Sequence, residues 1–130
     1  MSPEERSAFL SVPRTAVFAT TGPGGRPHAV PVWFLWGDGV IRVLTERGSQ
    51  KHRNAVRTGR AALCVEDRES GALSYLTAEG TVEVVDLVGP ADRLALWTHY
   101  RGEEAARAMV SRGGHERMVM LVIRPDRWLG

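Results

Sequence analysis

The residues best suited to chemistry lie close together in segment 45–54, which reads TERGSQKHRN. Its glycine and serine predict a turn that opens a helix, and Lys51, the only lysine of the chain, falls in the first turn of that helix. A cation there opposes the helix dipole, which favours negative charge at a helix start. A bound anion would remove this conflict, and free backbone N–H groups beside an ammonium and a hydroxyl group suit phosphate. We therefore expect a phosphate-binding site in this segment.

The surrounding stretch is strongly basic. Residues 42–60 contain six Lys and Arg side chains and one acid, Glu46. A solvated basic helix face is the simpler interpretation of such a cluster, and it stays open beside the phosphate site. The stretch contains no aromatic residue and no nucleic-acid recognition motif. We therefore expect no nucleic-acid partner.

The length of 130 residues and the hydrophobic fraction of 43% predict one globular domain over residues 1–130. The first residues lack the apolar run of a signal peptide, and no segment approaches the ~18 apolar residues of a membrane-spanning helix. We expect a cytoplasmic protein with no membrane partner. The single cysteine, Cys64, excludes an internal disulfide, and its apolar neighbours predict a buried structural thiol rather than a nucleophile.

The order of strands and helices predicts a mainly β fold. A short helix capped by Ser2 begins the chain, and glycine-rich turns then separate three strands that we expect to form a meander. The basic helix follows, from about Ser49 to Thr58, with Gly59 as its stop. We expect strands at 15–21, 28–36, 40–45, 61–66, 73–85 and 118–123, a polar loop at 67–71, one or two helices within 90–111 with a break near Gly102, and a short tail at 127–130.

Two of these strands are long enough to curl, and Gly80 permits a bulge or a sharp bend in the longest one. Six strands with few helices predict a small antiparallel β-barrel with peripheral helices.

No set of residues predicts chemistry by side chains alone. The four histidines are scattered without metal-ligand spacing, so no metal site is expected, and no nucleophile-elbow, P-loop or GxGxxG pattern occurs. No catalytic side chain is assigned. Any reaction is expected to depend on a bound cofactor.

Several motifs together resemble the FMN-binding split-barrel family, which includes pyridoxamine 5'-phosphate oxidase and relatives that use the deazaflavin coenzyme F420. The likeness covers residues 16–128 and is carried by the order of the elements and by three blocks: Thr45 with Gly48-Ser49-Gln50-Lys51 and Asn54, then Arg60-Ala61, then Ala78-Glu79-Gly80-Thr81-Val82. The resemblance implies a six-stranded antiparallel split β-barrel.

The resemblance also implies a binding site shared by two subunits of a homodimer. Residues implied to bind the cofactor phosphate are Thr45, Ser49, Gln50 and Lys51. Residues implied to lie along the cofactor ring are His28, Ala29, Val30, Pro31, Val32 and Trp33, and Tyr75 would come from the partner subunit. Pro31 removes a backbone donor in mid-strand, which predicts an edge strand or a bulge. Packing in the core is the alternative role for Trp33 and Tyr75.

The choice of cofactor is predicted from charge and from the same resemblance. The block at 48–51 and the compact length are most similar to the deazaflavin branch, and the excess of arginine at Arg47, Arg53 and Arg57 suits the polyglutamate tail of coenzyme F420. The C-terminal arginine and histidine pattern that pyridoxamine-phosphate oxidases use for substrate is missing. FMN remains the alternative cofactor.

These observations predict a coenzyme F420-dependent oxidoreductase that transfers a hydride between the deazaflavin and a small organic substrate. The alternatives are an FMN-dependent oxidoreductase of the pyridoxamine 5'-phosphate oxidase type, and a cofactor-binding protein without turnover. The sequence does not identify the substrate.

Overall fold

A computed structural model describes residues 1–69 and 74–130 of the chain. The predicted loop at 67–71 and the predicted strand start at 73 lie partly outside the described residues. The elements follow in the order α1 (Pro3–Leu10), β1 (Ala16–Thr21), η1 (Pro23–Gly25), β2 (Pro27–Val32), β3 (Leu35–Gly37), β4 (Val40–Glu46), α2 (Gln50–Thr58), β5 (Arg60–Asp67), β6 (Ser74–Val85), α3 (Pro90–Arg101), α4 (Glu103–Val110), η2 (His115–Arg117) and β7 (Met118–Leu129).

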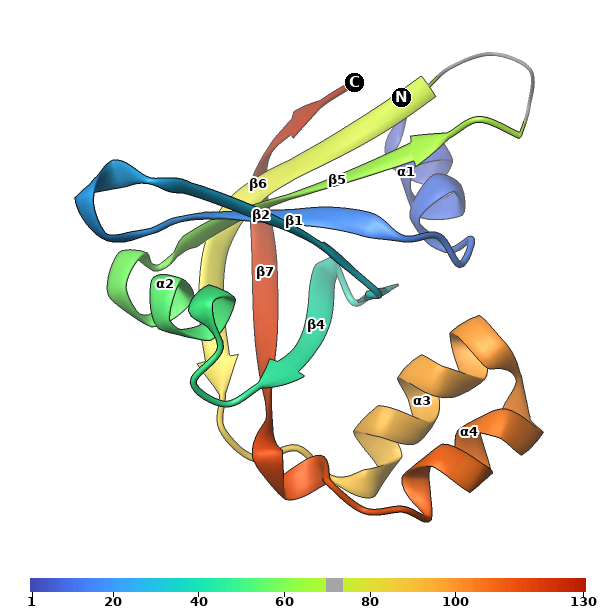
Figure 1. Cartoon of the computed structure of the whole chain (residues 1–130). Coiled ribbons are helices and arrows are strands. Elements are labelled where there is room, and N and C mark those ends of the chain that lie inside the picture. Colours follow the sequence, from blue (N-terminus) through green and yellow to red (C-terminus); the bar gives the residue numbers. More distant parts are fainter. Residues whose placement is uncertain (70–73) are drawn as a thin grey trace.

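The strands form one antiparallel sheet in the order β2-β1-β5-β6-β7-β4-β3. Its two edge strands, β2 and β3, are separated in sequence only by Trp33 and Phe34. Because two residues span only a short distance, the opposite edges of the sheet must approach each other. The sheet is therefore curled into a half-barrel, as Figure 1 shows.

The core fills the inner side of this curl. Burial alternates along β1 and β5, so Phe18, Leu63 and Val65 point inward while their neighbours point outward. Ile41, Leu121 and Ile123 complete the core from β4 and β7. Cys64 is half-buried because it lies on the outer face between the inward residues 63 and 65. The prediction of a buried thiol was therefore wrong.

The basic helix forms as its local signals predict. Ser49 is the N-cap of α2, and Gly59 ends the helix in the left-handed conformation with φ of 69°. The helix contacts β1, β4, β6 and β7 and buries Asn54 and Ala55 against the half-barrel. Its arginines are exposed, and Lys51 is half-buried.

The bend predicted at Gly80 is confirmed. The register between β6 and β7 shifts between Glu79 and Gly80, and a Cβ atom at Gly80 would clash with the backbone of Arg124. Pro125 faces Gly80 at this shift. A proline is tolerated there because the regular ladder is interrupted.

Two strand predictions were wrong, and within the described residues the sheet has seven strands rather than six. The run at 28–36 is two strands: its first part pairs with β1 and its last part with β4, so it breaks at Trp33 and Phe34. The last strand does not stop at Ile123 but continues past Pro125 to Leu129, where it pairs with Thr77. The predicted tail is therefore part of the sheet.

The segment at 90–111 folds into two helices, α3 and α4, separated by Gly102, which adopts a φ of 89°. In Figure 1 this helical hairpin projects from the half-barrel. Trp33 stacks on Tyr100 of α3 with ring centroids 4.6 Å apart and contacts Trp97 edge-on at 5.1 Å. Within residues 1–69 and 74–130, no helix is long and apolar enough to cross a membrane.

Candidate functional site

The predicted phosphate site is built where β4 turns into α2. Gly48, with φ of 81°, makes the turn, and its N–H donates to Nδ1 of His52 at 2.9 Å. Thr45 Oγ1 lies 3.0 Å from Ser49 Oγ, which also accepts from the backbone N–H of His52 at 3.4 Å. The end of the strand and the start of the helix thus bring two hydroxyl groups together.

Lys51 and the first amides of α2 remain without partners in the described part of the chain. The N–H of Arg53 donates to the carbonyl of Ser49, whereas no acceptor faces the N–H groups of Gln50 and Lys51. The half-buried Lys51 ammonium also has no ion-pair partner there. Burial lowers the pKa of Lys51, and the nearby charge of Glu46 opposes this shift. An uncompensated cation beside free amides suits a bound anion.

The arginines of the basic stretch are engaged within the chain. Their partners are Asp38 for Arg42, Asp86 for Arg47, Gly48 and Gln50 for Arg53, Thr21 and Asn54 for Arg57, and Asp126 for Arg60. Lys51 is therefore the cation of this stretch that has neither an ion-pair partner nor a hydrogen-bond partner within the described residues, whereas Arg53 and Arg57 contact neutral oxygen atoms. Arg57, which the sequence places at the cofactor, ties α2 to the end of β1 within the chain.

Asn54 is a residue of the site for which the sequence predicted no role. It is fully buried, donates to Thr20 Oγ1 of β1 at 3.0 Å, and accepts from Gln50 Nε2 at 2.7 Å. Arg57 also donates to its side-chain oxygen at 3.3 Å. Asn54 thereby fixes α2 against β1 and orients Gln50. In the sequence, Asn54 stands out only as a member of the motif block with Thr45 and residues 48–51, without a role of its own.

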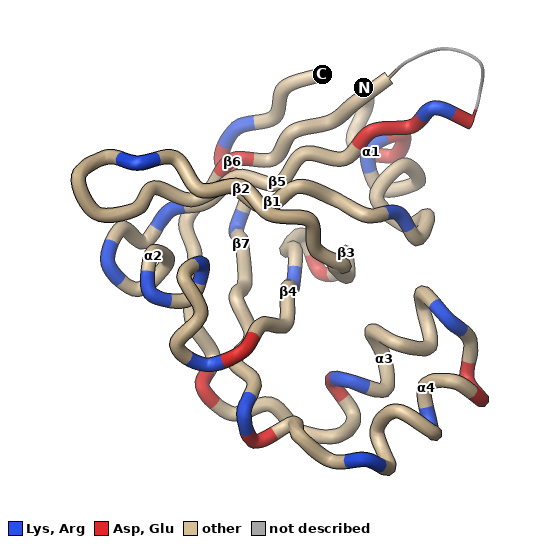
Figure 2. The backbone as a smooth tube through the Cα atoms, viewed as in Figure 1, with Lys and Arg blue, Asp and Glu red and all other residues tan. Residues whose placement is uncertain are grey.

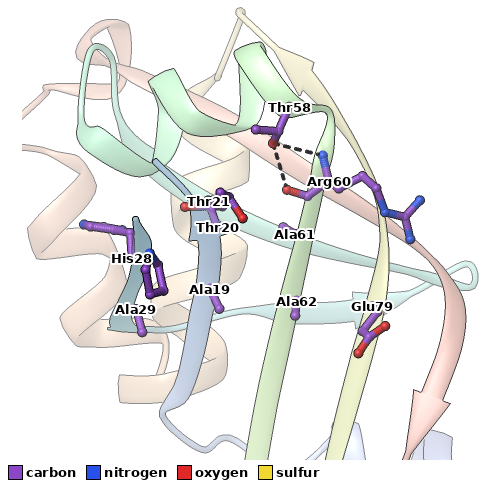
Figure 3. Close-up of a pocket in the computed structure, with 11 residues that line it drawn as sticks. Ala19, Thr20, Thr21, His28, Ala29, Thr58, Arg60, Ala61, Ala62 and Glu79 are labelled. Atoms are coloured by element: carbon purple, nitrogen blue, oxygen red, sulfur yellow. Dashed lines mark hydrogen bonds between the residues drawn. The ribbon is translucent and has the colours of Figure 1, made fainter. Parts of the chain in front are cut away.

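Two hollows lie beside this helix. The first, of about 570 Å³, lies between the β1–β2 turn and the start of α2, and its lining includes Arg26, His28, Gln50 and Asn54. The second, of about 590 Å³, lies on the outer face of the sheet (Figure 3). His28 lines both hollows. The structure thus brings together Gln50 and His28, which are 22 positions apart in the sequence.

The floor of the second hollow is flat and apolar. Ala19 is paired with Ala29 on one side and with Ala62 on the other, so three methyl groups lie in a row across β2, β1 and β5. Arg60 and Glu79 line the same hollow on the side of β5 and β6 (Figure 3). Small side chains beneath polar ones leave room for a flat ring system.

His28 carries a polar atom that nothing satisfies. Its Nδ1 is buried and has no hydrogen-bond partner among residues 1–69 and 74–130. A buried polar atom without a partner costs about 1–3 kcal/mol, and such atoms often mark binding sites. His28 is therefore the residue of β2 most clearly placed for a ligand.

The other residues predicted to lie along the ring do not share one face. Along β2, His28, Val30 and Val32 are half-buried, while Ala29 and Pro31 alternate with them and are exposed. Pro31 lies in an edge strand, as its missing donor indicates. Trp33 packs against α3 rather than in the core of the barrel.

Tyr75 lies far along β6 from the end of α2 within one subunit. It is 50% exposed near the beginning of β6, while α2 reaches β6 near Val82, whose N–H donates to the carbonyl of Gly59. Seven residues of extended strand separate these positions, roughly 23 Å.

No group of acidic, histidine and cysteine side chains suited to a metal occurs in the part of the chain that the structure describes.

The curled antiparallel sheet, the anion-ready start of α2 and the apolar hollow at the other end of α2 define a small cofactor-binding split barrel. The chain belongs to the pyridoxamine 5'-phosphate oxidase family, whose model matches residues 2–130. Among curated proteins none matches the chain.

Solved structures agree with this assignment. A conserved hypothetical protein of Mycobacterium tuberculosis is 30% identical, with a TM-score of 0.83 over 98% of this chain and 82% of that one. An F420 reductase is 27% identical, with a TM-score of 0.79 over 95% of this chain and 94% of its own. A heme storage protein of Vibrio cholerae, 16% identical with a TM-score of 0.72 over 98% of this chain and 92% of its own, shares the fold.

Proposed function

We propose that this protein is a coenzyme F420-dependent oxidoreductase that transfers a hydride between the deazaflavin and a small organic substrate. The observation that carries the proposal is the position of Lys51. Its ammonium has no ion-pair partner among the described residues, and it belongs to a helix start with free amides at Gln50 and Lys51 and with the hydroxyl groups of Thr45 and Ser49. Gln50 of the same turn lines the first hollow, and His28 lines both this hollow and the apolar second one. The likeness to an F420 reductase supports this choice of cofactor.

The residues of the chain would bind and orient the cofactor. Lys51, Ser49 and Thr45 hold the phosphate, and Gln50, oriented by Asn54, lies between that phosphate and β2. His28 offers its unsatisfied Nδ1 to the bound group, and the row of alanines supports one face of the ring. When bound, a deazaflavin supplies two-electron chemistry at its ring. The protein then contributes orientation and the exclusion of water.

The charge around the first hollow favours a cofactor with an acidic tail. Segments 6–37 and 47–65 contain no Asp or Glu. Figure 2 shows basic residues along α2 and at the β1–β2 turn, where Arg26 has no acceptor among the described residues. A tail with several carboxylates would be attracted to this surface more strongly than FMN.

We propose that the functional unit is a homodimer. The outer face of β2, β1, β5 and β6 presents small and apolar side chains: Val17, Ala19, Ala29, Pro31, Ala62, Cys64 and Thr77. Val17 is 45% exposed at the centre of this face. A second copy would cover it, and the partner subunit would supply Tyr75 to a site that one chain leaves open.

Two other functions have support of their own. An FMN-dependent oxidoreductase would use the same phosphate site, and a cofactor carrier without turnover is suggested by the shared fold of a heme storage protein. The test is to titrate the protein with coenzyme F420, FMN and heme, and then to assay the reduced complex against a panel of quinones, enones and tetrapyrroles. We expect F420 to bind more tightly than FMN and heme. We also expect at least one substrate class to oxidise the reduced F420 in the complex. Tight binding with no turnover across the panel favours the carrier.

A further inference from the structure

The two edge strands of the half-barrel separate at a defined point. The β1–β2 ladder ends at the pair Ala16 and Val32. If the same register continued, Arg14 would lie opposite Phe34. The ladder does not continue, and the chain leaves β2 at Trp33 to join β4 through β3.

A side chain from α3 occupies the position of the missing ladder. The hydroxyl of Tyr100 accepts from the backbone N–H of Phe34 at 3.0 Å and lies 2.8 Å from the carbonyl oxygen of Arg14 and 3.1 Å from that of Phe34. Since a hydroxyl group has one hydrogen, it donates to one carbonyl at a time. Tyr100 therefore bridges the two residues that would have been partners in the sheet.

The same tyrosine also positions Trp33. The two rings are stacked with an interplanar angle of 7°, and the Arg101 guanidinium lies 5.5 Å from the Trp33 ring centroid. A hollow of about 280 Å³, lined by Thr15, Pro31, Val32 and Trp33, lies at the separation of the strands. The hydroxyl and the ring of one residue thus contact Phe34 and Trp33, the two residues that follow the end of β2.

We propose that Tyr100 is a positioning residue for the cofactor site: its hydroxyl ends the β1–β2 ladder and fixes the strand along which the bound ring lies. The inference rests on the proposed function, because β2 is the strand that would contact the ring. It makes the α3–α4 hairpin part of the binding machinery, although the hairpin projects from the half-barrel. By linkage, a cofactor that needs β2 in this position strengthens the Tyr100 contact in return.

The variant Tyr100→Phe tests this role, because it removes the hydroxyl and keeps the ring stacked on Trp33. We expect the Phe34 amide to exchange with solvent about fivefold faster or more, while the Phe18 and Val30 amides in the middle of the ladder do not change. We expect the dissociation constant for the intact cofactor to rise about threefold to tenfold. The affinity of inorganic phosphate for the Lys51 site, measured by competition, should stay the same. A general loss of stability would weaken phosphate binding as well.

The matched control is Thr98→Val, which removes an exposed hydroxyl from the same helix. It should leave Phe34 exchange and cofactor affinity as in the wild-type protein. Unchanged Phe34 exchange in Tyr100→Phe overturns the bridge, and faster exchange with unchanged cofactor affinity overturns its link to the site. If Tyr100→Phe does not fold, the wild-type protein provides the test. Its Phe34 amide should be protected from exchange with solvent, and cofactor binding should slow this exchange further. Absence of either effect overturns the proposal.

Failure of the proposed function gives a different result. In that case the wild-type protein binds neither coenzyme F420 nor FMN, and the proposed link between Tyr100 and the cofactor site is contradicted as well. The exchange rate of Phe34 in Tyr100→Phe still shows whether the hydroxyl bridges the strands.

Discussion

The hydroxyl oxygen of Thr45 lies 3.0 Å from that of Ser49. This contact joins the end of β4 to the residue that caps α2, so the position of the strand determines the position of the helix start. Two hydroxyl groups that share one hydrogen bond retain further capacity to donate to an anion. The proposed phosphate site therefore depends on the strand–helix junction and not on the helix alone.

Replacing Lys51 tests that site. We expect Lys51→Ala to weaken cofactor binding about tenfold to a hundredfold, because a charge-assisted hydrogen bond contributes roughly 1.5–3 kcal/mol. The control is Arg112→Ala, which removes the same charge from an exposed residue in the turn after α4. Fluorescence titration measures the cofactor dissociation constants of the two variants for this comparison. Equal affinity of the two variants would show that Lys51 is an ordinary surface cation.

The same residue predicts a pH dependence of the empty protein. Burial lowers the pKa of Lys51 on folding, so the folded state binds fewer protons than the unfolded state between the lowered value and the ordinary value of about 10.4. The free energy of unfolding should therefore rise with pH across that interval, and Lys51→Ala should lose this rise. Urea denaturation at a series of alkaline pH values measures it. A wild-type curve that matches the variant at every pH contradicts the burial of an unpaired ammonium.

Asn54 should matter for both stability and binding. Asn54→Ala leaves the Thr20 hydroxyl and the Gln50 amide without their partner, and we expect the free energy of unfolding to fall by about 1–3 kcal/mol. Cofactor affinity should fall as well, because Gln50 loses its orientation. Thr20→Val is the control, since it removes only the contact to β1. If it weakens binding as much as Asn54→Ala, then Gln50 has no part in the site.

The proposed dimer can be disrupted at the centre of the outer sheet face. Val17→Arg places a charge there without changing the residues that line either large hollow, so we expect a monomer that binds cofactor poorly. Leu87→Arg, at a position 88% exposed away from this face, should remain dimeric. Sedimentation at micromolar concentration measures both. A wild-type monomer that binds cofactor fully contradicts the shared site.

The parts of this structure that local chemistry determines were predictable from the sequence. Ser49 and Gly59 set the limits of α2, and Gly80 marks the bend of β6. The break after β2 was not predictable, because the hydroxyl that binds Phe34 comes from a residue 66 positions away. The continuation of β7 past Pro125 was not predicted, because it depends on the register shift at Gly80 of the neighbouring strand.

The candidate site also has parts that the sequence predicts and parts that it does not. The hydroxyl groups and Lys51 are close in sequence, so their proximity could be predicted. The pairing of Arg60 with Asp126 and the meeting of His28 with Gln50 depend on how distant strands and the helix pack. The sequence therefore could not show which arginines already have a partner within the chain.

The measurement that tests the central claim most directly is a fluorescence titration of the wild-type protein with coenzyme F420 of different tail lengths and with FMN, each at two ionic strengths. We predict that F420 binds more tightly than FMN, that its affinity rises with the number of glutamates, and that this advantage falls as salt is raised. FMN binding that equals or exceeds F420 binding, with no dependence on tail length, would contradict the deazaflavin assignment.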